Sequence, residues 1–149
     1  MKASKSIFYL DDDIDDLYFF KEVAEGLGHD VSIYINGHEM LRALDKKPQP
    51  DIIFLDIHMP VLNGEEILNV LKKSDDYKHI PIVMISGAYP KKLVRHYLEA
   101  GANYLMKKPS FVDLKTSLEE VLKIDWNTFR AYAWIDGGAY LIIMAHDYR

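Results

Sequence analysis

The sequence contains no cysteine, and this absence removes three kinds of chemistry. Without thiols the chain cannot form disulfides, bind a metal through thiolates or use a cysteine nucleophile. An excess of positive charge is also missing, because 23 acidic residues outnumber 18 basic ones and give a net charge of −5. That balance argues against nonspecific affinity for nucleic acid or an anionic membrane. We therefore expect no nucleic acid and no membrane among the partners.

Long apolar runs are missing as well. The first run, residues 7–10, is stopped by Asp11 and is too short for a signal peptide or a membrane span. Hydrophobic residues still make up 49% of the 149 residues, which is enough for one domain with a sizeable core. We expect a single cytoplasmic domain with at most a short appendage.

Short apolar runs alternate with stretches of helical period from residue 6 to about residue 123. The runs lie at residues 7–10, 31–35, 51–55, 80–85 and 103–106. The helical stretches lie at residues 14–27, 40–44, 63–71 (with Asn63 as N-cap and Glu66 three residues on), 90–101 and 111–122. Runs that are apolar throughout are typical of strands buried on both faces of a parallel sheet. The alternation predicts an α/β fold with helices on both faces of that sheet.

Polar side chains stand where four of these runs end. The runs lead into Asp11–Asp13, Asp56, Ser86 and Lys107–Lys108 with Pro109. Because the carboxyl ends of parallel strands meet at one edge of a sheet, we expect these groups to converge there. Two unit charges ~4 Å apart repel by about 4 kcal/mol at an effective dielectric of about 20, so clustered carboxylates need protons or a cation. Carboxylate oxygens are hard ligands, so the cation expected here is magnesium or a similar ion.

Each of these features alone is weak evidence. Asp11–Asp13 is as often a turn or helix cap as a site, and Ser86 alone is more often a turn residue. Four strand ends that all carry a suitable group are far less expected by chance. With a metal, an ammonium group and a hydroxyl around it, Asp56 has what is needed to hold a phosphoryl group for transfer.

In their order and spacing, the motifs resemble the receiver domain of two-component signalling, and in particular the short stand-alone regulators of bacteria. The matching segments are 8–13, 51–60, 63–64, 81–87 and 101–109. The resemblance covers residues 5–124 and leaves residues 125–149 as a C-terminal extension. It implies a doubly wound, flavodoxin-like, five-stranded parallel sheet with strand order 2-1-3-4-5.

The resemblance also implies roles for the clustered residues. Asp56 would accept the phosphoryl group, and Ser86 and Lys108 would hold its oxygens. The Mg²⁺ ligands would be Asp11 (through water), Asp12, Asp56 and the backbone carbonyl of His58. Such a chain is not an enzyme in the usual sense, because it catalyses only its own phosphorylation and dephosphorylation.

The implied partners are proteins. The phosphoryl donor would be a sensor histidine kinase or a histidine phosphotransfer protein, and residues 13–17 with the 109–111 loop would face it. The downstream target is unknown. The face made by the fourth helix, fifth strand and fifth helix is the expected output surface or homodimer interface.

Two positions depart from the family pattern. The family's switch aromatic should fall at Leu105, whereas the aromatic here is Tyr104, one place earlier. The usual coupling of this position to Ser86 is therefore expected to involve a smaller change in surface. Two residues after Ser86 stands Ala88, which has no polar group to orient or block an attacking water.

The last 25 residues carry a different pattern. Residues 129–135 and 139–144 are aromatic and β-branched runs joined by Asp136-Gly137-Gly138, which favours a β-hairpin. A continued fifth helix around Trp126 is the alternative. An isolated hairpin is marginal in water, so it should pack on the receiver, a second copy or a partner. The segment is too short and insufficiently basic for a DNA-binding output domain.

Two other functions remain as alternatives. A magnesium-dependent phosphatase with an aspartyl-phosphate intermediate uses similar groups, but it usually carries its nucleophile on the first strand and has a cap domain. A pseudo-receiver that is never phosphorylated would act only as a scaffold, and the complete set of acids with Ser86 and Lys108 speaks against it.

Overall fold

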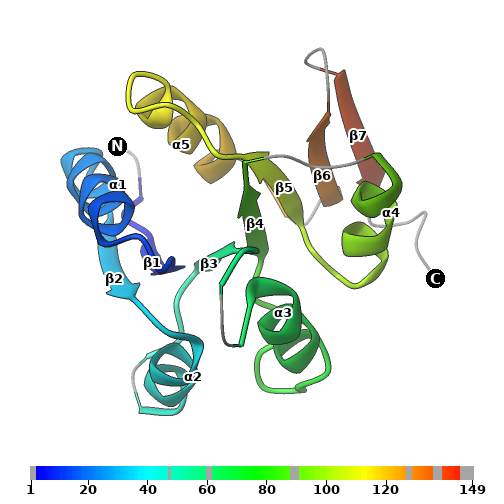
Figure 1. Cartoon of the computed structure of the whole chain (residues 1–149), viewed down its shortest axis with the longest axis horizontal. Coiled ribbons are helices and arrows are strands. Elements are labelled where there is room, and N and C mark those ends of the chain that lie inside the picture. The colour runs from blue at the N-terminus through cyan, green and yellow to red at the C-terminus, as the bar shows by residue number, and fades with distance from the viewer. Residues whose placement is uncertain are drawn as a thin grey trace.

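The computed structural model describes residues 3–46, 48–59, 62–87, 91–126, 129–135 and 139–144 (Figure 1). Its strands are β1 Ser6–Leu10, β2 Asp30–Tyr34, β3 Ile52–Asp56, β4 Ile82–Ser86, β5 Tyr104–Lys107, β6 Phe129–Ile135 and β7 Ala139–Met144. Its helices are α1 Ile14–Gly26, α2 Gly37–Lys46, α3 Gly64–Lys72, α4 Lys91–Glu99 and α5 Leu114–Leu122. Strands and helices alternate along the chain as far as α5, as the sequence pattern predicted.

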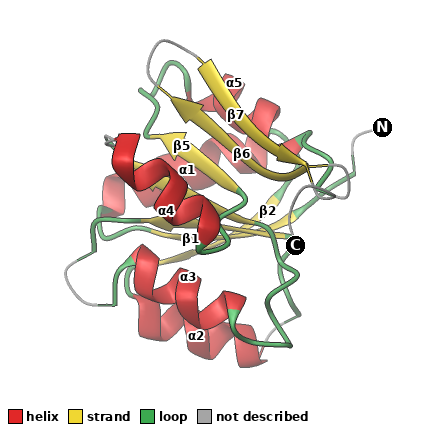
Figure 2. Ribbon diagram, turned by 90° about the vertical axis from the view of Figure 1, so that its right-hand side faces the viewer, coloured by secondary structure: helices red, strands yellow, loops and turns green. Residues whose placement is uncertain are grey.

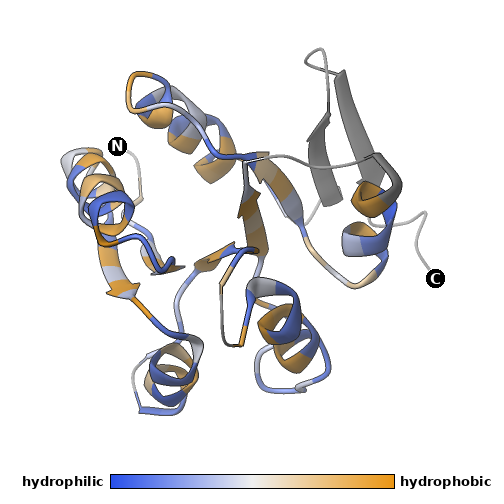
Figure 3. Ribbon diagram, viewed as in Figure 1, coloured by the Kyte–Doolittle hydropathy of each residue, from blue (hydrophilic) through white to orange (hydrophobic). Residues whose placement is uncertain are grey.

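Strands β1 to β5 form a parallel sheet in the order β2-β1-β3-β4-β5, which confirms the predicted fold class. Helices α1 and α5 cover one face, and α2, α3 and α4 cover the other (Figures 1 and 2). The central strands β3 and β4 are buried along their whole length, and hydrophobic residues dominate them (Figure 3). Burial on both faces explains why their sequences are continuous apolar runs.

Local signals set the start of α3 and the turn that follows α4. Asn63 caps α3 in a full capping box, because its side chain accepts from the Glu66 N–H and the Glu66 side chain accepts from the Asn63 N–H. After α4 the chain turns at Gly101 with φ of 110°, a conformation that favours glycine. Pro90, the predicted start of the fourth helix, lies outside the described residues.

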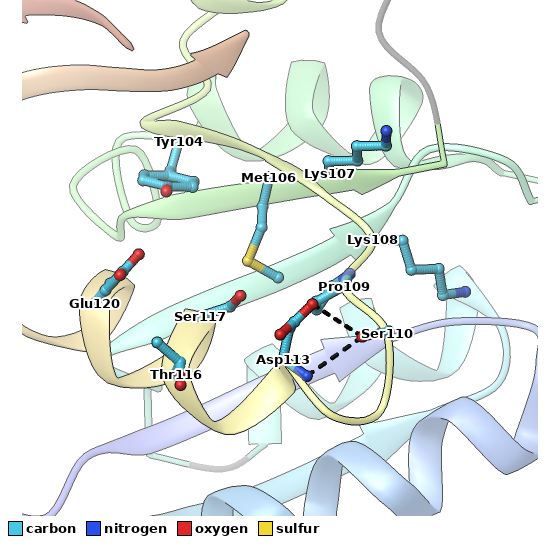
Figure 4. A pocket seen from close by; sticks show the side chains of 10 residues that line it. All are labelled: Tyr104, Met106, Lys107, Lys108, Pro109, Ser110, Asp113, Thr116, Ser117 and Glu120. Carbon is cyan, nitrogen blue, oxygen red and sulfur yellow. Dashed lines mark hydrogen bonds between the residues drawn. The ribbon is translucent and has the colours of Figure 1, made fainter. Parts of the chain in front are cut away.

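The predicted start of the fifth helix at Phe111 is wrong, since α5 begins at Leu114. The Ser110 hydroxyl donates to the Asp113 carboxylate, and the Asp113 N–H is 3.3 Å from the same hydroxyl oxygen (Figure 4). These two hydrogen bonds hold a turn before the helix. Phe111 lies in that turn, exposed, with its ring centroid 4.3 Å from that of Phe19 on α1.

The C-terminal segment forms strands where the sequence favoured a hairpin, not a continued helix. β6 pairs parallel to β5, and β7 pairs antiparallel to β6, so the sheet has the order β2-β1-β3-β4-β5-β6-β7 (Figure 1). The turn residues 136–138 lie outside the described residues. The outer edge of β5, expected to belong to an open surface, is therefore paired along Tyr104 and Leu105. This pairing satisfies backbone groups that an edge strand would leave open.

Within the part of the chain that the structure describes, no helix combines the length and the apolar character that crossing a bilayer requires.

β6 pairs with β5 on one side and with β7 on the other, so we expect Ala133→Pro to weaken this part of the sheet. Proline cannot donate a ladder hydrogen bond, and a lost bond of this kind costs about 1–3 kcal/mol. Hydrogen exchange of the amides at residues 104–107 should therefore speed up at least ~fivefold. Ala133→Gly keeps the N–H and is the matched control. Unchanged exchange at residues 104–107 in the proline variant would contradict the described pairing.

Candidate functional site

Three carboxylates lie close together at the C-terminal ends of the parallel strands. Asp11 directly follows β1 and Asp56 ends the neighbouring β3, where both are buried, with 0% and 7% of their surface exposed. Asp12 is exposed beside them. One oxygen from each of the three lies within 4.8 Å of the others. The parallel register of β1 and β3 thus brings together acids 45 residues apart, as the sequence predicted they would converge.

Asp11 is held as a carboxylate by three donors. The Tyr9 hydroxyl donates to Oδ2 at 2.5 Å, Lys108 Nζ donates to the same oxygen at 3.0 Å, and the Asp13 N–H donates to Oδ1 at 2.9 Å. Burial alone would raise the pKa of Asp11, but these hydrogen bonds outweigh it and lower that pKa below its ordinary value. Asp11 is therefore the fixed negative charge of the site.

Asp56 is in the opposite electrostatic situation. Its Oδ1 accepts the His58 N–H at 3.0 Å. Burial, together with the neighbouring Asp11 carboxylate, nevertheless raises the pKa of Asp56 from 3.8 to about 7. Near neutral pH, a positive charge close to Asp56 would favour its ionised form. Closely spaced hard oxygen ligands that repel one another are a donor set that a divalent cation fits.

Lys108 brings positive charge to this cluster from the end of β5. Its Nζ contacts Oδ2 of Asp11 at 3.0 Å and Oδ2 of Asp16, in the first turn of α1, at 2.5 Å. Burial would lower the pKa of Lys108, but the two carboxylates raise it above its ordinary value. The side chain of the neighbouring Lys107 points in a different direction, and that residue is exposed (Figure 4). Of the two lysines, Lys108 is thus the one that contacts Asp11.

Ser86 ends β4 and is buried, with 2% of its surface exposed. Its backbone carbonyl accepts the Lys108 N–H at 2.8 Å, which ties the ends of β4 and β5 together. Its hydroxyl oxygen lies 3.0 Å from Nε2 of His58. Parallel pairing of β3, β4 and β5 thus places Ser86 between the strands that carry Asp56 and Lys108.

Gly64 explains how closely the end of β3 and α3 approach each other. A Cβ at this position would lie 2.5 Å from the backbone oxygen of Asp56, closer than any real contact of that kind. Only glycine therefore allows α3 to begin against the end of β3. The Asn63-Gly64 pair fixes both the cap of α3 and the position of the Asp56 backbone.

Sequence reasoning missed three side chains of the site. Tyr9 could have been found, because it stands two residues before Asp11 on a strand and so shares its direction. Asp16 lies one turn into α1, and an excess of acids there was the only signal. For His58 only the backbone carbonyl was assigned a role, and nothing in the sequence indicates that its imidazole reaches Ser86 across 28 residues.

The departure at the fifth strand has a clear structural form. Leu105 is fully buried on the face covered by α3 and α4, in the same cluster as Tyr97 and Leu98 of α4. Tyr104 is on the opposite face, where it lines a cavity between β5 and α5 (Figure 4). An aromatic ring at position 104 therefore cannot take the place of one at 105. Ala88 lies outside the described residues.

The raised pKa of Asp56 predicts a stabilising effect of Asp56→Asn in metal-free buffer. In the folded chain Asp56 keeps its proton up to about pH 7, whereas in the unfolded chain it loses it near pH 3.8. Its contribution to stability is present below pH 3.8 and is lost as the pH rises through 7. Asparagine does not ionise, so the variant should gain on the order of 4 kcal/mol at pH 8 and less than half of that at pH 5.

Denaturant unfolding with EDTA at both pH values measures this difference. Asp30→Asn, which replaces an exposed aspartate at the start of β2, is the matched control and should show no such trend. An Asp56→Asn gain that is equal at pH 5 and pH 8 would contradict the raised pKa.

The response regulator receiver domain family matches this chain over residues 7–119. A curated relative is the polar-differentiation response regulator DivK of Brucella anthropi, 28% identical over 105 residues, which cover 70% of this chain and 85% of DivK. Among solved structures, chemotaxis protein CheY4 of Vibrio cholerae is 25% identical with a TM-score of 0.71, covering 80% of this chain and 99% of CheY4.

The phosphorylated cyanobacterial phytochrome response regulator RcpA is also 25% identical, with a TM-score of 0.72 over 81% of this chain and 96% of RcpA. The family match covers most of the chain, and the fold and the clustered acids agree with it. The chain belongs to the response regulator receiver domain family of two-component signalling.

Proposed function

We propose that the chain accepts a phosphoryl group on Asp56 from a phosphohistidine, with Mg²⁺ bound beside it, and signals by contact with another protein. The observation that carries the proposal is the cluster of three carboxylates within 4.8 Å of one another, with Lys108 bonded to Asp11. Family membership supports the same chemistry. One structural relative, RcpA, was solved in phosphorylated form.

The metal site would use the donor set already described. Asp12 and Asp56 would bind Mg²⁺ directly, Asp11 through water, and His58 through its backbone carbonyl. When bound, the ion would neutralise negative charge on the carboxylates and on the phosphoryl oxygens. Burial and the neighbouring Asp11 carboxylate raise the pKa of Asp56, and this is the observation in this chain that favours a cation here.

The chain's own residues then divide the work of transfer. An oxygen of the ionised Asp56 attacks phosphorus, the new O–P bond forms as the N–P bond of the phosphohistidine breaks, and the donor imidazole keeps the released electron pair. Lys108 and the Ser86 hydroxyl would hold phosphoryl oxygens and balance their charge. To do so, Lys108 exchanges part of its present contact with Asp16 for the incoming group.

Incubation with acetyl phosphate tests the proposal directly. We expect intact-protein mass spectrometry to show one added phosphoryl group in the presence of Mg²⁺ and none with EDTA. Asp56→Asn should remain unmodified, because it lacks the acceptor carboxylate. A chain that gains nothing under any of these conditions would refute the phosphoacceptor role and favour the pseudo-receiver.

The two alternative functions are not favoured. The family match supports a receiver over a phosphatase. The nucleophile of a phosphatase would lie on β1, but the acid that follows β1, Asp11, is hydrogen-bonded to Tyr9 and Lys108. A scaffold without chemistry gives no reason for Lys108 to be directed at these acids. We also propose that the chain catalyses only its own phosphorylation and dephosphorylation, and that it works in the cytoplasm.

The donor-facing surface would surround the acids. Exposed apolar side chains lie on α1 and in the loop before α5, next to the sheet edge that carries Asp56: Ile14, Tyr18, Phe111 and Val112. The Phe19–Phe111 ring contact joins the two segments. Asp16, first considered part of this surface, contacts Lys108, so a charge change there would disturb the site itself. The apolar group is therefore the better test of docking.

Val112→Asp should slow phosphoryl transfer from a histidine kinase or phosphotransfer protein. A charge in an apolar contact costs about 1–3 kcal/mol, equivalent to roughly five- to a hundredfold in rate. A panel of autophosphorylated kinases from the source organism, screened with the native chain, supplies the donor. Acetyl phosphate reports on the site without docking.

Val70→Asp is the matched control, because Val70 is an exposed valine on α3, on the opposite face of the sheet. It should leave transfer from the protein donor unchanged. If Val112→Asp and Val70→Asp slow this transfer equally, the surface assignment is wrong.

The face expected to be the output surface includes β5, and β6 pairs along the outer edge of that strand. We propose that a target, or a second copy of the chain in a homodimer, would meet α4 and the β6–β7 hairpin there rather than an open β5 edge.

A further inference from the structure

The side chain of His58 makes a contact that the receiver chemistry described above does not use. Its Nε2 lies 3.0 Å from Oγ of Ser86, although 28 residues separate the two. Ser86 is buried and His58 is exposed, so the imidazole reaches into the site from the solvent side. The contact involves the hydroxyl group proposed to hold a phosphoryl oxygen.

A serine hydroxyl at this position needs an external restraint. Serine lacks the second branch at Cβ that stiffens threonine, so its χ1 torsion has three accessible staggered wells. Ser86 is buried, so the hydrogen bonds that orient its hydroxyl must come from within the protein. A hydrogen bond from the His58 ring nitrogen selects the χ1 rotamer of Ser86 in which Oγ lies toward His58 and the loop after β3.

His58 itself is well fixed relative to the acceptor. Its backbone N–H donates to Oδ1 of Asp56 at 3.0 Å, which holds the loop after β3 against the carboxylate. Through its side chain the same residue reaches Ser86. One residue thus contacts both the Asp56 carboxylate at the end of β3 and the Ser86 hydroxyl at the end of β4.

We propose that His58 is a positioning residue for phosphoryl capture: its Nε2–H donates to Ser86 Oγ and orients that hydroxyl toward the phosphoryl group on Asp56. A hydroxyl accepts such a bond and retains its own proton, which it donates to a phosphoryl oxygen. The inference rests on the proposed function of Asp56 and adds to it a role for the His58 side chain.

Two amide substitutions separate this role from general damage. In His58→Gln the side-chain nitrogen can reach the place of Nε2 and donate to Ser86. In His58→Asn the shorter side chain places its nitrogen near Nδ1 and cannot reach. Both variants keep the backbone N–H and carbonyl of residue 58, and both are neutral and polar.

The experiment measures the rate of phosphorylation by acetyl phosphate at saturating Mg²⁺, followed by intact-protein mass spectrometry. Loss of one hydrogen bond should slow His58→Asn about three- to tenfold, and His58→Gln should restore the rate to within about twofold of the native chain. In a Ser86→Ala background, His58→Asn should cause no further slowing, because the hydroxyl through which it acts is gone.

Three results would overturn the inference while the proposed function stands: equal slowing by His58→Asn with and without Ser86, no slowing in either background, or His58→Gln as slow as His58→Asn. A native chain that gains no phosphoryl group refutes the proposed function itself, and the positioning role with it. The native chain measured in the same series therefore distinguishes the two failures.

Discussion

Repulsion between buried carboxylates is the constraint on which the rest of this structure depends. Asp11 and Asp56 end neighbouring strands and lie almost fully out of water, where two negative charges cannot both be stable without compensation. Lys108 and Tyr9 hold Asp11 in its charged form, so the cost falls on Asp56, whose pKa rises to about 7. This asymmetry leaves Asp56 as the group that a cation or a covalent modification would change most.

The sheet maintains this arrangement because it is parallel and continuous. Each chemical group stands at the end of a different strand, and the register of the strands fixes their separation. Apolar runs bury the strands on both faces, so the polar ends cannot slip along the sheet without moving a core residue into the wrong layer. Gly64 closes the arrangement from the side of α3, since any Cβ there would collide with the Asp56 backbone.

The sequence was sufficient for those features that depend on local pattern. Apolar runs and helical periods predicted the strands and helices, and strand ends predicted which acids would converge, because both follow from geometry common to all parallel sheets. The contacts of Asp16 and His58 could not be predicted, since each depends on how a loop or helix end is placed in three dimensions. The start of α5 was predicted too early at Phe111, because the Ser110–Asp113 hydrogen bonds compete with helix formation over those residues.

The hairpin was anticipated from the sequence, but its pairing with the outer edge of β5 was not, and this pairing leaves β5 with a neighbour on both sides. β5 is paired on both sides, with β4 through Ser86 and Lys107 and with β6 through Leu105 and Ala133. Among the described residues, two pairs join β5 to β6 and six join β6 to β7, so β6 is paired more extensively with β7 than with the receiver. A shift of β5 that accompanies a change at Ser86 or Lys108 must therefore either carry the hairpin along or break its shorter contact. Leu105 is fully buried and Tyr104 lies on the opposite face, so backbone pairing through β5 joins the strands that carry the acid cluster to the hairpin.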